Sequence, residues 1–291
     1  MTRRLLTSIL LLSGFLLNIQ HGWAGLTPGV NANSAILIEA GSGKVLYSKN
    51  SRAIMAPAST TKIMTAILAL EHVPLDKTVR VCPEAAAREG TSMNLVTREQ
   101  KTMRELLYGL MLVSGNDAAT AIAEAVSGSE KNFARLMNQK AKLLGMKNTH
   151  FLNASGLPEI GHYTTAYDLA ILTRYALKNK NFAKIVDTKV KQVTGAKPGT
   201  NRTLINHNKL LWQYQYTIGV KTGYTRTAGG CLVSAANQNG VKLISVILKS
   251  NSIYNDSKAL LDYGFAVYRV KKNNHSLASI STILPENPTL N

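Results

Sequence analysis

The order of the secondary-structure signals predicts an α/β (α+β) fold, in which helices flank an antiparallel sheet and part of the chain forms a mainly helical subdomain. Two strands are expected at 35–40 and 44–47, on either side of the glycine-containing turn 41–44. A mainly helical middle runs from 59 to 187, and strands return before a final helix over 256–270. This order, β, α, β, α, favours helices packed against an antiparallel sheet.

The clearest strand signal is a hairpin late in the chain. Residues 217–225 have the composition of a strand, the next strand begins at Gly229, and an apolar run follows at 241–248. Asn239-Gly240 separates the last two runs. Asn-Gly between apolar runs is a strong hairpin signal because both residues accept the positive φ of a tight turn. The sequence therefore predicts antiparallel pairing in this part of the sheet.

A helix is predicted to begin at Ser59, because the run that follows to Leu70 is rich in Ala, Leu, Ile and Met. Free backbone N–H groups and the positive dipole at such an end favour negative charge that develops on a bound carbonyl oxygen. Residues three apart share a helix face, so Lys62 is expected to reach the Ser59 hydroxyl. That amine can accept the hydroxyl proton if burial and a nearby positive charge, which Lys221 can supply, lower its pKa.

Two further polar strings accompany Ser59. Ser114-Gly115-Asn116 follows the apolar run 106–113 and precedes another helical stretch, so it connects two buried helices. A hydroxyl and an amide at this spacing suit a proton relay beside a nucleophile and a donor to a peptide carbonyl. Lys221-Thr222-Gly223 lies in the strand 217–225. A cation and a hydroxyl on a strand edge suit a terminal carboxylate, while an extended peptide pairs with the backbone.

Each string alone has an ordinary structural explanation. Ser59 and Lys62 can be a helix N-cap and a solvated lysine, the second string a capped turn, and Lys221 a lysine on a solvated sheet face. Ser-x-x-Lys and Lys-Thr-Gly also arise by chance in a chain of 291 residues. The three strings nevertheless agree in order, separation and context with the S-x-x-K, S-D-N and K-T-G set of penicillin-recognising serine acyl-transfer enzymes. This conjunction indicates an enzyme.

At these residues the chain resembles the serine D-alanyl-D-alanine carboxypeptidase family of low-molecular-mass penicillin-binding proteins. The similarity runs from about Ala35 to about Val270. It is carried by four strings: Pro57-Ala58-Ser59-Thr60-Thr61-Lys62-Ile63-Met64-Thr65, Phe151-Leu152-Asn153-Ala154-Ser155-Gly156-Leu157, His162-Tyr163-Thr164-Thr165-Ala166-Tyr167-Asp168-Leu169 and Lys221-Thr222-Gly223-Tyr224-Thr225. The resemblance implies the family's α/β fold, shared by β-lactamases and transpeptidases.

The resemblance also implies roles for the site residues. Ser59 would be acylated, Lys62 would be the general base, and Ser114 would relay a proton to the leaving D-alanine. Asn116 would hold the substrate amide, and Lys221 and Thr222 would bind the C-terminal carboxylate. The substrate-binding set would be completed by Gly223, Tyr224 and Arg202, of which Arg202 matches a family arginine near the carboxylate site. The backbone N–H groups of Ser59 and Tyr224 would form the oxyanion hole, and neither a cofactor nor a metal is expected.

The implied substrates are peptidoglycan stem peptides, with release of the terminal D-alanine from pentapeptides as the main reaction and β-lactam antibiotics as covalent inhibitors. A peptidoglycan DD-endopeptidase that cuts cross-links is the first alternative. A β-lactamase is a second, disfavoured because no Glu-x-x-Leu-Asn lies between Asn116 and Lys221 and Glu159 has no matching Asn. A non-enzymatic wall-binding or penicillin-sensing module is disfavoured because every catalytic position is present.

The amino-terminal segment 1–24 is predicted to be a secretory signal. Arg3 and Arg4 precede an apolar core over 5–17, and Gly22-Trp23-Ala24 suits a cleavage site. The core is short for a membrane span, and an uncleaved anchor is the alternative. We therefore expect an exported enzyme of the cell envelope, periplasmic or secreted.

The catalytic domain is expected over 25–270, where the similarity and the strong hydrophobic pattern end. The chain then becomes polar at Lys271-Lys272-Asn273-Asn274. The tail 271–291 is too short for a second β domain and has too little apolar length and charge for a convincing membrane anchor. A single catalytic domain is expected.

Composition limits the classes of partner. The formal net charge is +18, from 34 Lys and Arg against 16 Asp and Glu, which favours polyanions such as anionic wall polymers or a membrane surface. No recognition helix, zinc finger or interleaved aromatic pattern supports nucleic-acid binding, although the charge alone is compatible with it. Cys82 and Cys231 are expected to be unpaired. The six histidines show no H-E-x-x-H spacing, so a metallopeptidase is disfavoured.

Overall fold

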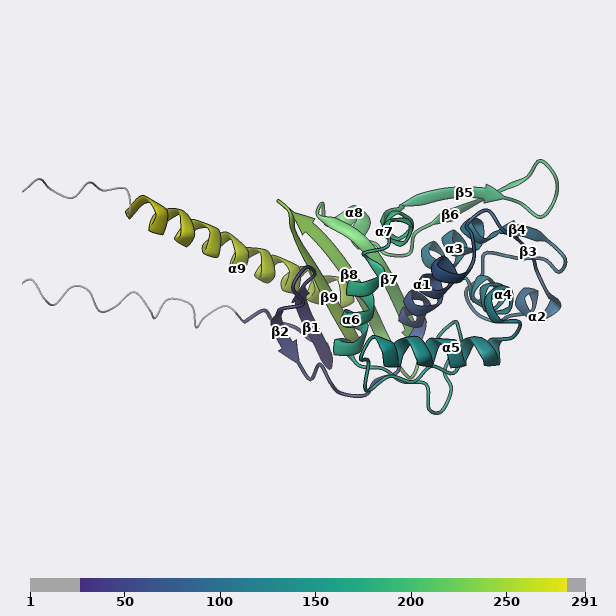
Figure 1. The fold of residues 1–291 in the computed structure, drawn as a ribbon, viewed down its shortest axis with the longest axis horizontal. Helices are drawn as coiled ribbons and strands as arrows, with labels where there is room; N and C mark the ends of the chain where they lie inside the picture. Colours follow the sequence, from purple (N-terminus) through teal and green to yellow (C-terminus); the bar gives the residue numbers. More distant parts are fainter. Residues whose placement is uncertain (1–26, 282–291) are drawn as a thin grey trace, which may run out of the picture.

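The computed structural model describes residues 27–281. The predicted signal segment 1–24 and the last part of the predicted tail, 282–291, lie outside these residues. The main sheet has five strands. Figure 1 shows helices against this sheet and a mainly helical region beside it. The antiparallel sheet, its flanking helices and the helical region confirm the predicted fold class.

The central sheet is antiparallel throughout, with the strand order β2-β1-β9-β8-β7. Its strands are β1 (Ser34–Glu39), β2 (Val45–Lys49), β7 (Thr217–Thr225), β8 (Gly229–Gln238) and β9 (Val241–Ser250). The turn between β8 and β9 has positive φ at both central residues, 52° at Asn239 and 84° at Gly240, as the Asn-Gly signal predicts. β7 is an edge strand, so one side of its backbone has no partner within this sheet.

The other elements are mainly helical. These are a 3₁₀ turn η1 (Ala58–Thr61) and the helices α1 (Lys62–His72), α2 (Pro83–Ala86), α3 (Met103–Leu112), α4 (Asn116–Ser127), α5 (Glu130–Leu143), α6 (Ala166–Ala176), α7 (Lys180–Asp187) and α8 (Leu210–Gln213). Two small hairpins pair β3 (Thr78–Arg80) with β4 (Gln100–Thr102) and β5 (Val190–Thr194) with β6 (Asn201–Ile205). Side-chain N-caps fix where several helices begin, for example Thr102 before α3 and Thr165 before α6.

Successive side chains of each strand point to opposite faces of the sheet, and apolar side chains on both faces form two cores. Ile36 and Ile38 of β1 pack with the helical region, whereas Ala35 and Leu37 point to the opposite face. There the second core is completed by a long helix, α9 (Ile253–Ser281), through residues that include Leu260. The sheet is therefore held between α9 and the helices that carry the polar strings.

α9 is longer than the sequence predicts. The expected end was Val270, but the helix continues through the polar run that follows to Ser281 and extends beyond the sheet in Figure 1. Polarity interrupts the apolar pattern without breaking a helix, because lysine is a good helix former and no Gly or Pro occurs between Val270 and Pro285. Within the part of the chain that the structure describes, no helix is both long enough and apolar enough to span a membrane.

Candidate active site

Ser59 lies in the 3₁₀ turn η1, immediately before α1, rather than in the first turn of an α-helix as predicted. Packing explains the difference. A Cβ on Gly156, where φ is +83°, would lie 1.8 Å from the carbonyl oxygen of Ala58, and a Cβ on Gly223 would lie 2.9 Å from the backbone nitrogen of Ser59. The segments that contain Gly156 and Gly223 therefore pack closely against the turn and hold Ser59 between them.

Lys62 reaches the Ser59 hydroxyl as its three-residue spacing predicts. Its side chain is fully buried, and the Nζ atom lies 2.9 Å from Ser59 Oγ. The same nitrogen donates to Asn116 Oδ1 at 2.7 Å and to the carbonyl oxygen of Ser155 at 2.7 Å. Lys62 thus connects three segments that are distant in the sequence.

The electrostatic surroundings of Lys62 favour the neutral amine. Burial lowers its pKa well below the ordinary lysine value, and the positive charge of Lys221 lowers it further. Arg88 acts in the same direction, whereas the carboxylate of Asp117 opposes them. A neutral amine has a lone pair that can accept the Ser59 proton, which is the requirement for a general base.

Ser114-Gly115-Asn116 connects α3 to α4 as predicted. Ser114 has a φ of +62°, and its carbonyl oxygen accepts a hydrogen bond from Thr91 Oγ1 at 2.7 Å. Asn116 donates through Nδ2 to the carbonyl oxygen of Glu89 at 2.8 Å while its Oδ1 accepts from Lys62. The Ser114 hydroxyl makes no hydrogen bond among the described residues and is available to a substrate or water.

Lys221 occupies the edge strand β7 beside the nucleophile. Its side chain is 1% exposed, and its Nζ donates to the carbonyl oxygen of Thr222 at 3.1 Å. Burial lowers the pKa of Lys221 to about 7. The close approach of Gly223 to Ser59 places β7 against η1, with the exposed side chain of Tyr224 following on the strand. The first and third strings therefore meet where β7 packs against η1.

Arg202 is not brought to this cluster. It lies on β6, where its two terminal nitrogens bind Glu99 at 2.6 and 2.9 Å, and one of them also donates to the carbonyl oxygen of Asn94 at 2.6 Å. Its described contacts include none with Ser59, Lys62 or Lys221. The guanidinium is committed to an ion pair between β6 and the segment before β4, which corrects its expected place at the carboxylate site.

Sequence reasoning assigned no role to two groups that the structure places at the site. The carbonyl oxygen of Ser155 accepts from Lys62, and only the resemblance of segment 151–157 pointed to this region. His207 is the second: burial lowers its pKa, and the positive charge of Lys221 adds to that effect. Its segment, Asn206-His207-Asn208, carries no motif by which spacing alone could have identified it.

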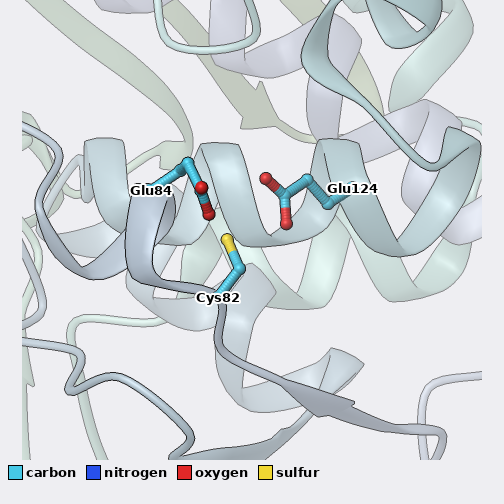
Figure 2. Close-up of side chains that lie close together, drawn as sticks. All are labelled: Cys82, Glu84 and Glu124. Carbon is cyan, nitrogen blue, oxygen red and sulfur yellow. The ribbon is translucent and has the colours of Figure 1, made fainter.

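Neither cysteine makes a described contact with Ser59, Lys62 or Lys221. Cys82 and Cys231 are both free thiols, as predicted. Among the described residues, one group could hold a metal ion: ligand atoms of Cys82, Glu84 and Glu124 lie within 4.8 Å of one another (Figure 2). Cys82 Sγ also caps α2 by accepting from Ala85 N, and burial together with Glu124 raises the thiol pKa to about 11. The thiol stays protonated at neutral pH and is a poor metal ligand there.

A serine hydrogen-bonded to a buried lysine whose pKa is lowered, on a sheet-and-helix scaffold with a second buried lysine on the edge strand, defines a serine acyl-transfer enzyme. Comparison with known proteins gives the family. Residues 24–252 match the D-alanyl-D-alanine carboxypeptidase model, and the chain belongs to this family of serine peptidases.

Similar proteins cover most of the chain. D-alanyl-D-alanine carboxypeptidase DacF of Bacillus subtilis is 39% identical over 262 residues, which are 86% of this chain and 67% of that protein. A D-alanyl-D-alanine carboxypeptidase of a Streptomyces species is 36% identical, over 90% of this chain and 97% of its own. The crystal structure of a Streptomyces DD-transpeptidase superposes with a TM-score of 0.78 at 36% identity, covering 82% of this chain and 99% of that chain.

Proposed function

We propose that the protein releases the terminal D-alanine from peptidoglycan stem pentapeptides through an acyl-enzyme on Ser59, and that β-lactams acylate the same hydroxyl. The observation that carries this proposal is the 2.9 Å contact between Ser59 Oγ and the buried Lys62 Nζ, whose pKa is strongly lowered. Family membership supports both the reaction class and penicillin binding.

In the proposed mechanism the substrate is oriented by its free carboxylate. Lys221 is buried on the edge strand β7 and has no carboxylate partner among the described residues. Thr222 follows it on the strand. A substrate carboxylate would supply the missing counter-charge and restore the protonated form of Lys221. The penultimate D-alanine carbonyl then lies at Ser59, where the backbone N–H groups of Ser59 and Tyr224 stabilise its developing oxyanion.

Proton transfer divides between two groups. Lys62 accepts the Ser59 proton as Oγ attacks the carbonyl carbon, and the tetrahedral intermediate collapses with cleavage of the peptide C–N bond. Ser114, with its unbonded hydroxyl, relays that proton from Lys62 to the departing amine of D-alanine, so that Lys62 is neutral and Ser114 is again a hydroxyl after the C–N bond breaks. Asn116 holds Lys62 through Oδ1 and offers Nδ2 to the substrate carbonyl once it leaves Glu89. A water molecule then hydrolyses the ester and regenerates Ser59.

We also propose a cellular location for this reaction. A catalytic unit over 25–270 acts outside the cytoplasmic membrane, where its stem-peptide substrate is found. The predicted signal over 1–24 and the extracytoplasmic location of the family support export. The net charge of +18 supports contact with anionic wall polymers or the membrane surface.

The test combines two measurements on the same preparation. Fluorescent penicillin should label the protein covalently on Ser59, and a purified pentapeptide should lose one D-alanine, detected by mass spectrometry. Labelling without peptide hydrolysis would indicate a penicillin-sensing module, and rapid hydrolysis of the penicillin label would indicate a β-lactamase. Either result would overturn the carboxypeptidase proposal.

A DD-endopeptidase or transpeptidase is the second candidate, favoured by the similarity to a solved Streptomyces DD-transpeptidase. A carboxylate beside the scissile bond is present in cross-linked substrates as well, so Lys221 does not separate the two reactions. Cleavage rates of cross-linked muropeptide dimers and pentapeptide monomers decide between them. Faster cleavage of dimers would replace the carboxypeptidase assignment while leaving the acyl-enzyme mechanism unchanged.

A further inference from the structure

The start of β7 borders a cavity that contains none of the residues assigned to catalysis. It has a volume of about 1130 Å³, and the whole segment 211–218, which leads from α8 into β7, lines it. Residues from the end of α7, the end of β8 and α9 complete the walls, and Figure 1 shows α7 and α8 near one another beside the sheet. We call this cavity the α8 cleft. Its volume exceeds that of ordinary small-molecule pockets, roughly 300 to 1,000 Å³, so it suits a ligand of several linked units.

The α8 cleft has an exposed aromatic side chain. Trp212 lines it with 48% of its surface exposed, and it is the one tryptophan among the described residues. Its indole nitrogen makes no hydrogen bond with any described residue. An exposed indole offers a flat apolar face that packs against the C–H face of a sugar ring, and an N–H donor at its edge. Trp212 therefore suits a ligand with apolar faces and polar edges.

Polar side chains without partners lie around this ring. Gln213, Gln215 and Asn237 line the cleft, and their amides make no hydrogen bond with the described residues. Thr217 lines it too, and its Oγ1 has no partner although the residue is only 9% exposed. Buried hydroxyls are normally hydrogen-bonded, and each amide has both a donor and an acceptor to offer. The cleft can therefore satisfy a ligand that carries many hydroxyl and amide groups.

The charges in the cleft balance. Two carboxylates line it, those of Asp187 and Asp262, and two ammonium groups, those of Lys189 and Lys258. Asp262 also accepts a hydrogen bond from Tyr214 Oη at 2.7 Å, which fixes one wall. The formal charge of the lining is therefore zero, in a chain whose net charge is +18. A neutral ligand fits this balance better than a polyanion, which the rest of the surface favours.

The position of the cleft on β7 relates it to the proposed reaction. Thr217, in its wall, is four residues before Lys221, a distance of roughly 13 Å along the strand. A stem peptide with its carboxylate at Lys221 and its scissile carbonyl at Tyr224 runs toward the end of β7, away from the cleft. The glycan strand that carries this stem therefore lies on the other side of the catalytic site. A glycan in the α8 cleft belongs to a neighbouring strand.

We infer that the α8 cleft binds the glycan strand of peptidoglycan, a neutral chain of N-acetylated amino sugars. Trp212 packs against a sugar ring, and the amides of Gln213, Gln215 and Asn237 bind its hydroxyl and acetamido groups. The inference rests on the proposed function for the identity of this polymer, whereas the cleft alone indicates a neutral sugar chain. Binding to a neighbouring strand holds the catalytic site close to further stems and raises their effective concentration.

The first experiment uses the fluorescence of Trp212 itself. The sequence has two tryptophans, Trp23 and Trp212, so cleavage after the predicted signal leaves Trp212 as the single emitter. Titration of the mature protein with the soluble tetramer of N-acetylglucosamine should give a saturable change in emission. The midpoint should hardly change with added salt, because the ligand is neutral and screening acts on charges. No saturable change, or one that salt abolishes, would overturn the glycan site.

Variants then test which residues bind, with retention on insoluble chitin as the measurement. Trp212→Ala should weaken retention by about tenfold or more, the effect of losing an aromatic contact, whereas Trp212→Phe keeps a ring and should retain more. Leu143→Ala is the matched control, since Leu143 is an exposed apolar residue that does not line the cleft. It should bind like the wild type. Equal retention of Trp212→Ala and the wild type would overturn the assignment.

Activity measurements separate this site from the proposed function. Trp212→Ala should release D-alanine from a soluble pentapeptide at the wild-type rate but have a higher KM on polymeric peptidoglycan. The same KM on the polymer as the wild type would overturn the anchoring role, while D-alanine release would still support the carboxypeptidase. Saturable binding of the sugar tetramer without D-alanine release from either substrate would overturn the proposed function and still support the cleft as a glycan site.

Discussion

Three lysines are fully buried in the described part of the molecule, and they occupy two different environments. Lys101 lies 2.9 Å from Glu99 and 2.7 Å from Thr194 Oγ1, so its charge is compensated. Glu99 also binds Arg202, and these hydrogen bonds lower its pKa although burial alone raises it. Lys62 and Lys221 have no carboxylate partner within hydrogen-bonding distance among the described residues, and burial lowers the pKa of both.

The difference shows how the same side chain becomes structural or catalytic. A buried ammonium with an ion-pair partner stays charged and holds segments together. A buried amine without one gives up its proton more easily, which costs stability but creates a base. Four predictions test this contrast, in order of decreasing effect.

The largest effect is expected for Ser59→Ala. Removing the nucleophile should reduce D-alanine release by roughly a thousandfold or more and abolish covalent penicillin labelling, because no acyl-enzyme can form. The hydroxyl is partly exposed and its partner Lys62 keeps two other hydrogen bonds, so the midpoint of thermal unfolding should hardly move. A variant that still acquired the label would assign the nucleophile elsewhere.

The second prediction compares the same substitution, lysine to methionine, in the two environments. Lys62→Met should lower penicillin acylation by roughly a thousandfold while changing stability little, since removal of a buried amine that has no carboxylate partner offsets the loss of its hydrogen bonds to Asn116 and Ser155. Lys101→Met should instead keep the activity per folded molecule and lose about 1 to 3 kcal/mol of stability, because Glu99 loses one of its two cationic partners and keeps Arg202. Denaturant unfolding and acylation rates measure both. Equal losses of activity in the two variants would contradict the assignment of Lys62 as catalytic and Lys101 as structural.

The third prediction concerns pH. Acylation should increase with pH as Lys62 loses its proton, with a midpoint well below the ordinary lysine value of about 10.4. Lys221→Gln removes a neighbouring positive charge, so the pKa of Lys62 rises and the midpoint moves to higher pH. KM should also increase, by roughly ten- to a hundredfold, through loss of the carboxylate contact. A shift in KM with an unmoved midpoint would restrict Lys221 to substrate binding.

The smallest effect is on stability. Lys221 has a pKa of about 7 in the folded protein, below the value of about 10.4 in the unfolded chain. Between these values the unfolded chain binds more protons, so stability rises with pH, by at most about 1.4 kcal/mol per pH unit from this group. Unfolding in urea at pH 7 and pH 9 measures it. The increase should be smaller in Lys221→Met; the same increase in both proteins would contradict the pKa assignment.

Local signals predicted the parts of the site that local geometry determines. The spacing of Ser59 and Lys62 fixes their contact, and the connector at Ser114 follows from two apolar runs with turn residues between them. The Asn-Gly hairpin likewise needs only its own φ angles. These features depend on residues that are close together in the sequence, so the sequence is sufficient for them.

Features that depend on tertiary packing were predicted poorly. The 3₁₀ form of η1 depends on contacts with Gly156 and Gly223, about 100 and 160 residues away. Arg202 was matched by segment similarity, but an ion pair with Glu99 determines its place. The carbonyl oxygen of Ser155 is a backbone group, which no residue-type pattern can reveal.

The register of the sheet bears on the timing of folding. β1 pairs with β9, joining Ser34–Glu39 to residues 243–248, and Lys62 binds partners from 116 and 155. Contacts of such sequence separation form late, because loop closure must precede them. The sheet cannot close until nearly the whole chain is available. For a protein that is exported, as we propose, the site around Ser59 is therefore completed only after most of the chain has been made.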